Sequence, residues 1–439
     1  MTLARPFCGL RYDATRVDLS KVIVPPYDVI AADERASYFD REPHNAIRFE
    51  LTRDIADEAD SNYGWIRETM DAWRESGVLI EDDEPSYYVM RQTYKGPSGE
   101  MLSRIGFFAE LGLEEYENRV VRPHERTLAG PKADRLKLLR AAEANLSSVF
   151  LLYEDREDEL GPILENALET GVIGRATDAA GVEYVLARLI DPEQTEIVRA
   201  FMASRPTVIA DGHHRYETAL EYRRQQVSAH GSDASAPWQS TIAYFANAYS
   251  AGSLLLPIHR VIRSAAAPSE EAWREKLTGW QVTRLPAATP DSIDTALAQH
   301  LAPLSAHPAF VAESSERYGG SLLLIQRDEA LAPRLMVRIL EEEILQVVFG
   351  LDSEAIRGGD VSFPKSAPRA AREVLDGEGS VALYLNPMSP DDVFRTTGHG
   401  EVMPQKSTFF YPKIPTGMAF RDHRGHPAQG QGGDSGQGR

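Results

Sequence analysis

The sequence Asp211-Gly212-His213-His214-Arg215 constrains the fold of this chain more than any other segment. It follows an apolar run at 207–210 that is typical of a short buried strand, and it precedes apolar positions at helical spacing. The segment therefore predicts a strand, a glycine turn and a helix that begins directly after the turn. Such a turn directs backbone N–H groups and the positive end of a helix dipole at one point.

The side chains of this segment match the chemistry of a phosphate site. Two imidazoles and a guanidinium would add directional donors for phosphate oxygens. The alternative is an ordinary turn in which His213, His214 and Arg215 satisfy carbonyl oxygens, but the concentration of donors favours the phosphate site. Asp211 has two interpretations, a Mg²⁺ ligand or a structural acceptor for the turn amides. Zinc is not favoured, because adjacent histidines point apart in an extended chain and no third soft ligand is nearby.

Residues 209–219 resemble the phosphate-binding box of the ParB/sulfiredoxin superfamily, and in particular that of the ParB-like free serine kinases. A second match is Arg-Pro-His-Glu at 122–125. In the kinases a similar Pro-His-Glu precedes a helix and supplies the glutamate that acts on the substrate hydroxyl. The resemblance therefore implies that the 211–215 box holds a nucleotide phosphate and that Glu125 is the catalytic base. The two segments are farther apart in sequence than in the compact kinases, which implies an insertion.

The whole chain more closely resembles one bacterial family, the domain of unknown function 1015 proteins. Four blocks carry this resemblance, at residues 24–30, 124–127, 211–215 and 403–413. Together they span almost all of the first 420 residues. The family is named for its lack of a known function, so the kinase hypothesis depends on the superfamily resemblance alone.

His124, Glu125 and Arg126 form the predicted catalytic group. They occupy a polar sequence before a predicted helix, where a carboxylate among cationic neighbours stays ionised. Such a carboxylate orients a hydroxyl group and accepts its proton as phosphoryl transfer proceeds. The alternative is a network of surface ion pairs. The kinase resemblance favours the catalytic interpretation.

Three further places carry candidate ligands. Lys132 and Arg135, near the start of the next helix, would hold a second phosphate or a substrate carboxylate, unless they are solvated charges. His259 and Arg260, at the end of an apolar strand, are either a second donor pair for the nucleotide or structural. Asp28 follows two prolines that fix a rigid turn. It either binds Mg²⁺, which prefers one or two carboxylates plus phosphate oxygens, or caps a helix that starts near residue 32.

Composition limits the classes of function. The chain has 439 residues, of which 42% are apolar and 26% charged, as expected for a soluble globular protein of two or three domains. Its net charge of −19 repels nucleic acids and anionic membranes. The single cysteine allows no internal disulfide, which fits a cytoplasmic protein. Neither a signal-peptide core nor an apolar stretch of about 20 residues is present, so no membrane association is expected.

The strand and helix patterns predict an α+β fold. They include a helix over 192–203, paired strands at 309–312 and 322–326, and a helix that starts after Ser389. We expect a ParB/sulfiredoxin-like mixed core with insertions over 1–264 and a C-terminal domain of α-helices and β-strands (an α/β domain) over 265–420. The boundary is placed where the sequence becomes rich in Ala, Pro and Thr. Residues 421–439 are rich in glycine without large apolar side chains, which predicts a disordered tail.

Two functional hypotheses follow. The first is a phosphotransferase that uses Mg²⁺ and a nucleotide, ATP or ADP, to phosphorylate a small hydroxyl compound, with free L-serine as the expected acceptor. The second is a nucleotide-gated binding or clamp protein of the ParB type. A DNA-binding helix-turn-helix after the box would favour the second hypothesis, but residues 228–265 predict a polar loop and apolar strands. The sequence leaves the oligomeric state open.

Overall fold

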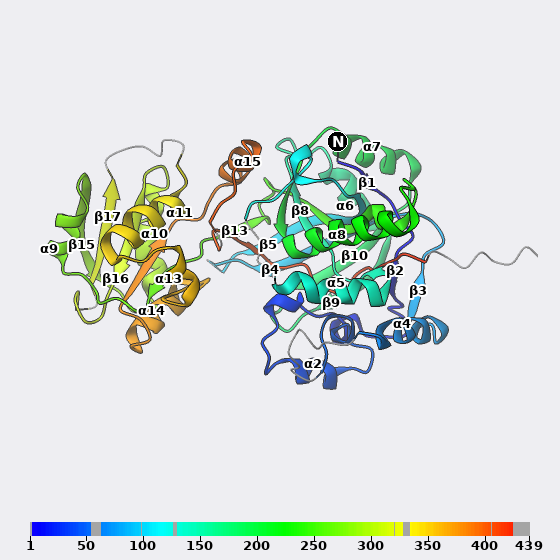
Figure 1. The fold of residues 1–439 in the computed structure, drawn as a ribbon, viewed down its shortest axis with the longest axis horizontal. Helices are drawn as coiled ribbons and strands as arrows, with labels where there is room; N and C mark the ends of the chain where they lie inside the picture. The colour runs from blue at the N-terminus through cyan, green and yellow to red at the C-terminus, as the bar shows by residue number, and fades with distance from the viewer. Residues whose placement is uncertain are drawn as a thin grey trace, which may run out of the picture. The chain divides into compact units, whose positions relative to one another are not determined.

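The computed structural model describes residues 2–53, 63–97, 99–125, 130–319, 321–327, 334–404 and 406–424. The chain divides into two compact units (Figure 1). The first unit consists of residues 1–123, 127–253 and 412–439, and the second of 124–126 and 254–411. The first unit therefore includes residues from both ends of the chain.

A nine-stranded sheet organises the first unit, in the order β6-β11-β8-β12-β5-β4-β10-β9 with β1 also paired to β5. Its strands are β1 (Ala4–Arg5), β4 (Tyr87–Lys95), β5 (Met101–Gly112), β6 (Val121–Arg122), β8 (Val149–Tyr153), β9 (Val172–Thr177), β10 (Glu183–Leu189), β11 (Thr207–Asp211) and β12 (Ser240–Asn247). The sheet is mixed, because β11 is parallel to β6 and antiparallel to β8. Two small pairs complete the strands, β2 (Leu10–Tyr12) with β3 (Leu79–Glu81) and β7 (Ala144–Asn145) with β21 (Arg421–Asp422).

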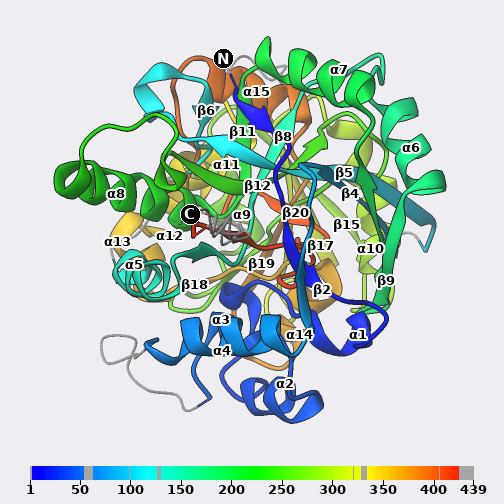
Figure 2. The same cartoon turned by 90° about the vertical axis from the view of Figure 1, so that its right-hand side faces the viewer.

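The first unit also contains helices. They are α1 (Leu19–Val22), η1 (Tyr27–Val29), α2 (Arg35–Arg41), α3 (Ile47–Glu50), α4 (Trp65–Glu75), η3 (Tyr116–Asn118), α5 (Gly130–Ala142), α6 (Gly161–Thr170), α7 (Pro192–Ala203), α8 (His213–His230) and η4 (Pro237–Gln239). Apolar side chains of α6, α7 and α8 form one core with those of β4, β5, β8 and β12. The N-terminal helices α2, α3 and α4 gather together in the first unit (Figure 2).

The second unit contains a six-stranded sheet in the order β15-β17-β16-β19-β14-β18. The strands of this sheet are β14 (Arg260–Ile262), β15 (Trp280–Ala287), β16 (Ala309–Glu313), β17 (Ser321–Arg327), β18 (Val361–Ser362) and β19 (Val381–Leu385). Two further strands, β13 (Leu254–Leu256) and β20 (Phe409–Tyr411), form a separate pair. The helices of the second unit are α9 (Glu270–Lys276), α10 (Ile293–His300), η5 (Ala302–Leu304), α11 (Met336–Ile339), the π-helical η6 (Leu340–Leu345), α12 (Gln346–Phe349), α13 (Ser353–Gly358), α14 (Ala367–Leu375) and α15 (Pro390–Gly398). Side chains of α10 and α14 pack on β14, β16 and β19.

The predicted α+β fold is confirmed. The helix predicted after Ser389 is α15, and Ser389 and Asp392 form the capping box that begins it. The strands predicted at 309–312 and 322–326 pair as β16 and β17. The predicted helix 192–203 is α7, and the Asp191 side chain accepts the N–H of Gln194 at its start.

The predicted boundary at 265 differs from the division of the structure, which falls after Ser253. The reason is strand pairing, because β13 pairs with β20 and β14 with β19. The segment rich in Ala, Pro and Thr forms α9 and β15 of the second unit, so its composition does not mark a linker.

The disordered tail predicted from residue 421 starts too early. Arg421 and Asp422 form β21, which pairs with β7. Asp422 also accepts from Arg67 at 2.9 Å and from Arg74 at 2.5 Å, so ion pairs replace the apolar contacts that the tail lacks. Residues 425–439 lie outside the described residues.

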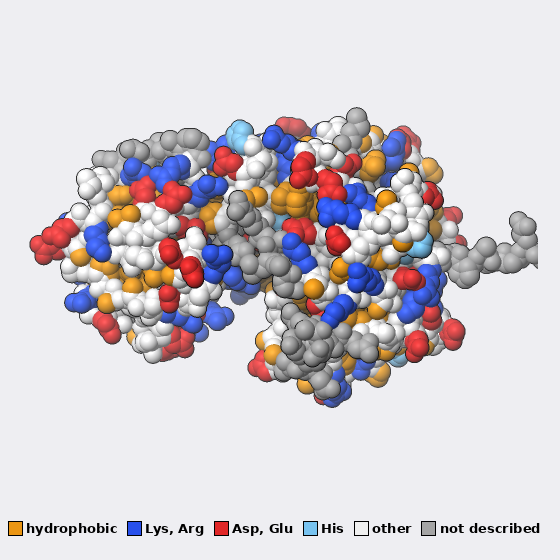
Figure 3. All heavy atoms as spheres, in the orientation of Figure 1, with side chains coloured by type: hydrophobic (Ala, Val, Ile, Leu, Met, Phe, Trp, Pro, Cys, Tyr) orange, Lys and Arg blue, Asp and Glu red, His pale blue; other side chains and the backbone are white. Residues whose placement is uncertain are grey.

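The described surface is of mixed charge. On the visible face, Lys and Arg side chains are interspersed with Asp and Glu (Figure 3). None of the helices in the described ranges combines the length and the apolar character needed to cross a membrane.

Candidate functional site

The predicted strand, turn and helix around the 211–215 box are confirmed. Strand β11 ends at Asp211 and α8 begins at His213. Gly212 connects them with a φ of 88°, a left-handed conformation that favours glycine. A Cβ at this position would also lie 2.9 Å from Nε of Arg215. The turn therefore needs glycine for two reasons, and Gly212 has no side chain that would cap the first N–H groups of α8.

Two cations hold the carboxylate of Asp211. Nη2 of Arg215 lies 2.5 Å from Oδ2, and Nζ of Lys413 donates to Oδ1. Arg215 also donates to the carbonyl oxygen of Ser148. Burial alone would raise the pKa of Asp211, but the charges of Lys413 and Arg215 outweigh it and lower that pKa to about 2. Asp211 is therefore ionised at every physiological pH.

Asp28 belongs to the same charged group. It lies in η1, where part of the residue is exposed to solvent although protein atoms surround its carboxyl group. Its pKa is raised, first because surrounding protein displaces water and second because the charge of Asp211 repels its own. Arg215 and Lys413 act in the opposite direction. Asp28 therefore lies near enough to the box for the charges of Asp211, Arg215 and Lys413 to act on it, and its role as a Mg²⁺ ligand stays a prediction. It does not cap the next helix, since α2 begins at Arg35 without a side-chain cap.

Arg135 supports this group from inside the protein. Only 4% of its side chain is exposed, and its guanidinium bonds Asp134 at 2.6 Å, Glu50 at 3.2 Å and the Tyr63 hydroxyl at 3.0 Å. It also lies over the ring of Tyr27 at 4.2 Å. Burial raises the pKa of Tyr27 to about 12, so this phenol stays neutral. The internal contacts of Arg135 make it a support for η1 rather than a donor to a ligand.

Lys132 forms an ion pair with a carboxylate of the protein, and its predicted contact with a second phosphate or a substrate carboxylate stays a prediction. Its ammonium pairs with Glu217, on α8 beyond the box. Lys132 and Glu217 line a cavity of about 510 Å³ with Tyr116 and Arg224. A second phosphate would have to compete with Glu217 for this lysine.

His124 and Glu125 belong to the second unit. The backbone of Glu125 pairs with Met403, and its carboxylate accepts the N–H of Lys406 at 3.4 Å. Nε2 of the buried His124 lies 3.1 Å from the Thr408 hydroxyl oxygen. These contacts join the predicted catalytic segment to the 403–413 block. The catalytic roles stay predictions, and Arg126 lies outside the described residues.

His259 and Arg260 also belong to the second unit. Their surroundings agree with a structural role rather than with a donor pair for the nucleotide. Both are buried, with 4% and 0% of their surface exposed. Burial and the charge of Arg260 lower the pKa of His259 to about 3, so the imidazole is neutral. Arg260 donates to the carbonyl oxygens of Ile258 at 2.6 Å and Lys406 at 3.2 Å. Both Nη groups of Arg260 therefore serve the fold, whereas its Nε and Nδ1 of His259 make no hydrogen bond with the described residues.

The carboxylates near the box fit a divalent ion only in part. Within the described ranges, no group of three or more His, Cys, Asp or Glu side chains is placed to hold a metal ion. Asp28 and Asp211 are two, which suffices for Mg²⁺ when phosphate oxygens supply further ligands. Both oxygens of Asp211 already contact cations, so Asp28 is the better direct ligand.

Sequence reasoning did not assign a role to Lys413. The residue lies in a block that the family resemblance singled out, but nothing in that block indicates that its ammonium reaches Asp211. Ser148 and Glu50 were also missed, because their contacts are made by a carbonyl oxygen and by a buried carboxylate at sites without a motif.

Comparison with solved structures finds weak likenesses. A variant of free serine kinase in complex with AMP is 12% identical with a TM-score of 0.35, and the match covers 72% of this chain and 91% of that chain. A conserved hypothetical protein from Pyrococcus furiosus is 11% identical with a TM-score of 0.33, over 73% and 96% of the two chains. TM-scores this low establish neither a shared fold nor a shared activity.

A search of the curated proteins finds no match. A family model described as "Protein of unknown function (DUF1015)" matches residues 4–327, most of the chain. The family resemblance is thereby confirmed, and three of the four sequence blocks lie within the match: the chain belongs to the DUF1015 family.

Proposed function

We propose that this protein is a phosphotransferase that depends on Mg²⁺ and a nucleotide and acts on a small hydroxyl compound, with free L-serine as the expected acceptor. The observation that supports the proposal best is the charged group at the start of α8. There Asp28, Asp211, Arg215 and Lys413 interact beside a glycine turn. We call these four residues and Gly212 the box cluster.

The box cluster has the donors that a nucleotide phosphate requires. The 18-residue helix α8 directs its dipole and its first N–H groups toward the turn. Arg215 and Lys413 add two positive charges with 10% and 16% of their side chains exposed. Charge-assisted hydrogen bonds in such a partly dry place are stronger than at an open surface. Phosphate oxygens would replace Asp211 as the partner of at least one of these cations.

Asp28 supports the proposed need for Mg²⁺. Displaced water, and next the negative charge of Asp211, raise the pKa of Asp28, and a divalent cation would relieve the repulsion between the two carboxylates. Asp28, and Asp211 if Lys413 moves to the phosphate, would hold the ion. Mg²⁺ would supply charge neutralisation on the phosphate oxygens.

The proposed reaction forms a bond between the acceptor hydroxyl oxygen and the terminal phosphorus of ATP or ADP. The bond from that phosphorus to the leaving nucleotide breaks, which yields ADP or AMP. The hydroxyl proton passes to a carboxylate, and Glu125 is the candidate through the kinase resemblance. Catalysis of this type consists of positioning and electrostatic stabilisation, which a cluster of fixed charges provides.

The direct test is product formation. Purified full-length protein is incubated with L-serine, MgCl₂ and either ATP or ADP, and phosphoserine is measured by mass spectrometry. L-Alanine, which lacks the hydroxyl group, is the matched control for the acceptor. We expect phosphoserine with one of the nucleotides and none when Arg215→Met replaces the wild type. Absence of phosphoserine with both nucleotides, in a folded sample, contradicts the assignment of serine.

The clamp hypothesis gains no support from the structure after the box. Helix α8 is followed by the single turn η4 and by strand β12, whose eight residues are all buried. A recognition helix would have to occupy this segment. The segment was expected to contain apolar strands, and β12 confirms that expectation.

A further inference from the structure

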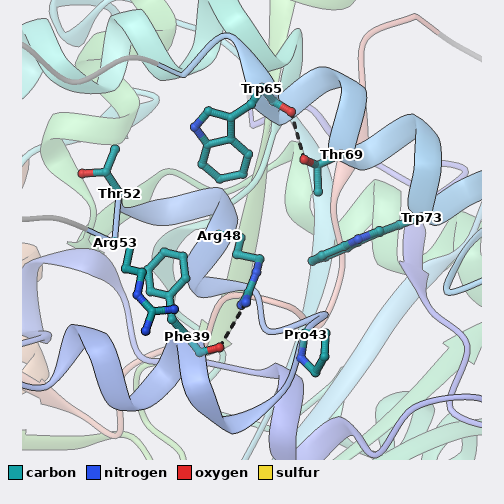
Figure 4. Close-up of a pocket in the computed structure, with 8 residues that line it drawn as sticks. All are labelled: Phe39, Pro43, Arg48, Thr52, Arg53, Trp65, Thr69 and Trp73. Carbon is teal, nitrogen blue, oxygen red and sulfur yellow. Dashed lines mark hydrogen bonds between the residues drawn. The ribbon is translucent and has the colours of Figure 1, made fainter.

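A cavity of about 400 Å³ lies in the N-terminal helical part of the first unit, and none of its lining residues belongs to the box cluster. Helices α2 and α4 and the ends of α3 supply its walls (Figure 4). The lining residues are Phe39, Pro43, Arg48, Thr52, Arg53, Trp65, Thr69 and Trp73. Its volume lies in the range of small-molecule sites, which is about 300–1,000 Å³.

Arg48 places a positive charge in this cavity. Its guanidinium donates to the carbonyl oxygens of Glu42 at 3.2 Å and Phe39 at 3.0 Å. In the part of the chain that the structure describes, no carboxylate lies within ion-pair distance of Arg48. Displaced water, and next the charge of Arg53, lower the pKa of Arg48. Carbonyl dipoles fix the direction of the guanidinium but do not neutralise it, so an anion would be stabilised here.

Arg53 strengthens the positive field at the same place. Both guanidinium groups lie over the ring of Phe39, at 4.9 Å for Arg48 and 5.9 Å for Arg53. Arg53 pairs with Asp40 at 2.8 Å, but both side chains of this pair are more than half exposed. Exposed pairs contribute little and exchange readily with other anions. The cavity therefore has one fixed cation and one that is available at its edge.

Aromatic rings supply much of the rest of the lining, beside Pro43 and two threonines. Trp73 is buried and fixed by its contacts with Phe49 and His44, whose ring centroids lie at 4.7 Å and 5.2 Å. Trp65 is partly exposed, and its carbonyl oxygen accepts from the Thr69 hydroxyl at 2.9 Å. Figure 4 shows Arg48 between Phe39 and Trp73, with the Trp65 ring across the space. Aromatic faces of this kind bind planar rings by stacking and by loss of hydrated apolar surface.

We propose that this cavity is a binding site for a small anion with a planar apolar body, of the class of aromatic carboxylates. Arg48 binds the charged group, and Trp65 and Trp73 contact the ring. Nothing in this proposal depends on the proposed phosphotransferase function, because the box cluster contributes no residue to the cavity.

The test uses calorimetric titration of the full-length protein with benzoate as the probe. Benzamide is the uncharged match of the same shape, and cyclohexanecarboxylate is the charged match without a flat ring. We expect saturable binding of benzoate. Benzamide and cyclohexanecarboxylate should each bind with an affinity lower by about tenfold or more, because one charge-assisted bond or one stacked ring is worth roughly a factor of ten.

Three variants locate the site. Arg48→Met removes the charge, and we expect it to lose benzoate binding by about tenfold or more. Trp65→Leu removes an aromatic wall of the cavity, so it should weaken the binding of benzoate more than the binding of cyclohexanecarboxylate. Arg199→Met is the matched control, since Arg199 is an exposed arginine paired with Glu196 in the same unit and should bind as the wild type does. Circular dichroism confirms folding of each variant.

The proposal is overturned if benzoate does not bind at concentrations up to about 10 mM, or if benzamide binds as tightly as benzoate. Unchanged binding in a folded Arg48→Met variant also overturns it. If Arg48→Met does not fold, the comparison of the three probes on the wild type and on Trp65→Leu decides. ADP should not displace benzoate, which separates this site from the proposed nucleotide site.

Discussion

Lys413 donates a hydrogen bond to Asp211 across 202 residues of sequence, and both residues belong to the first unit. The carbonyl oxygen of Lys413 accepts from the buried Gln92, and that of Pro412 accepts from the buried Arg104. The C-terminal segment is thus fixed on strands of the central sheet at the point where its lysine meets the box cluster. The cluster depends on residues from both ends of the chain.

Replacing Lys413 should change the stability of the protein in a pH-dependent way. The pKa of Asp211 is lowered, so its ion pairs stabilise the fold above the ordinary pKa of an aspartate and lose this effect as the pH falls toward 2. We expect Lys413→Met to reduce the free energy of unfolding near neutral pH, and the difference from wild type to shrink between about pH 4 and pH 2. Urea unfolding at several pH values measures this, and a difference independent of pH would contradict it.

Arg215→Ala should weaken nucleotide binding by roughly 1–3 kcal/mol, the value of a charge-assisted hydrogen bond. His214→Ala should act in the same direction if its imidazole faces the phosphates. Arg224→Ala is the control, since Arg224 lies on the same helix and pairs with the exposed Glu115. Calorimetric titration with ADP measures the three affinities. If both box variants bind ADP with the affinity of the wild type, the box has a structural role and does not bind the nucleotide.

Glu125→Gln should abolish turnover and leave nucleotide affinity near that of the wild type. The substitution removes a proton acceptor with little change in shape, so it affects kcat and not the ground state. Single-turnover phosphoserine formation and ADP titration are measured on the same sample. A variant that retains most of its turnover would show that another group accepts the proton.

Asp422→Asn should destabilise the first unit by roughly 2 kcal/mol, because Arg67 and Arg74 lose a charged acceptor of which only 1% is exposed. A chain that ends at Phe420 should lose at least as much. A chain that ends at Arg424 is the matched control, since it retains β21. Thermal unfolding measures all three, and a Phe420 truncation that melts like the wild type would contradict the role of β21.

The parts of the fold that the sequence predicted are those encoded locally. The box is a strand, a glycine and a helix within a few residues, and α15 begins with a capping box in four consecutive positions. In both cases the determining contacts are made between neighbours in the chain, so their pattern is visible in the sequence.

The parts that it missed depend on distant partners. The sequence does not indicate that Lys413 pairs with Asp211. It also does not indicate that Asp422 pairs with Arg67 and Arg74. Arg260 illustrates the reverse case, since its donor chemistry is that of a phosphate site but the residue is buried in the second unit, where its guanidinium donates to backbone carbonyl oxygens. Sequence patterns show which donors exist, and tertiary contacts decide what they bind.

Asp28 provides the most direct test of the box cluster as a Mg²⁺-nucleotide site. Displaced water, and next the charge of Asp211, raise the pKa of Asp28, so its charge opposes folding near neutral pH. Asp28→Asn should therefore raise Tm in the absence of ligand, whereas Asp33→Asn, outside the box cluster, should not. The decisive measurement is calorimetric titration of ADP with and without Mg²⁺ in the wild type and in Asp28→Asn. The account predicts that Mg²⁺ tightens ADP binding to the wild type by about tenfold or more and that Asp28→Asn loses this effect. Equal Mg²⁺ effects in both proteins, or no ADP binding to the wild type, would contradict it.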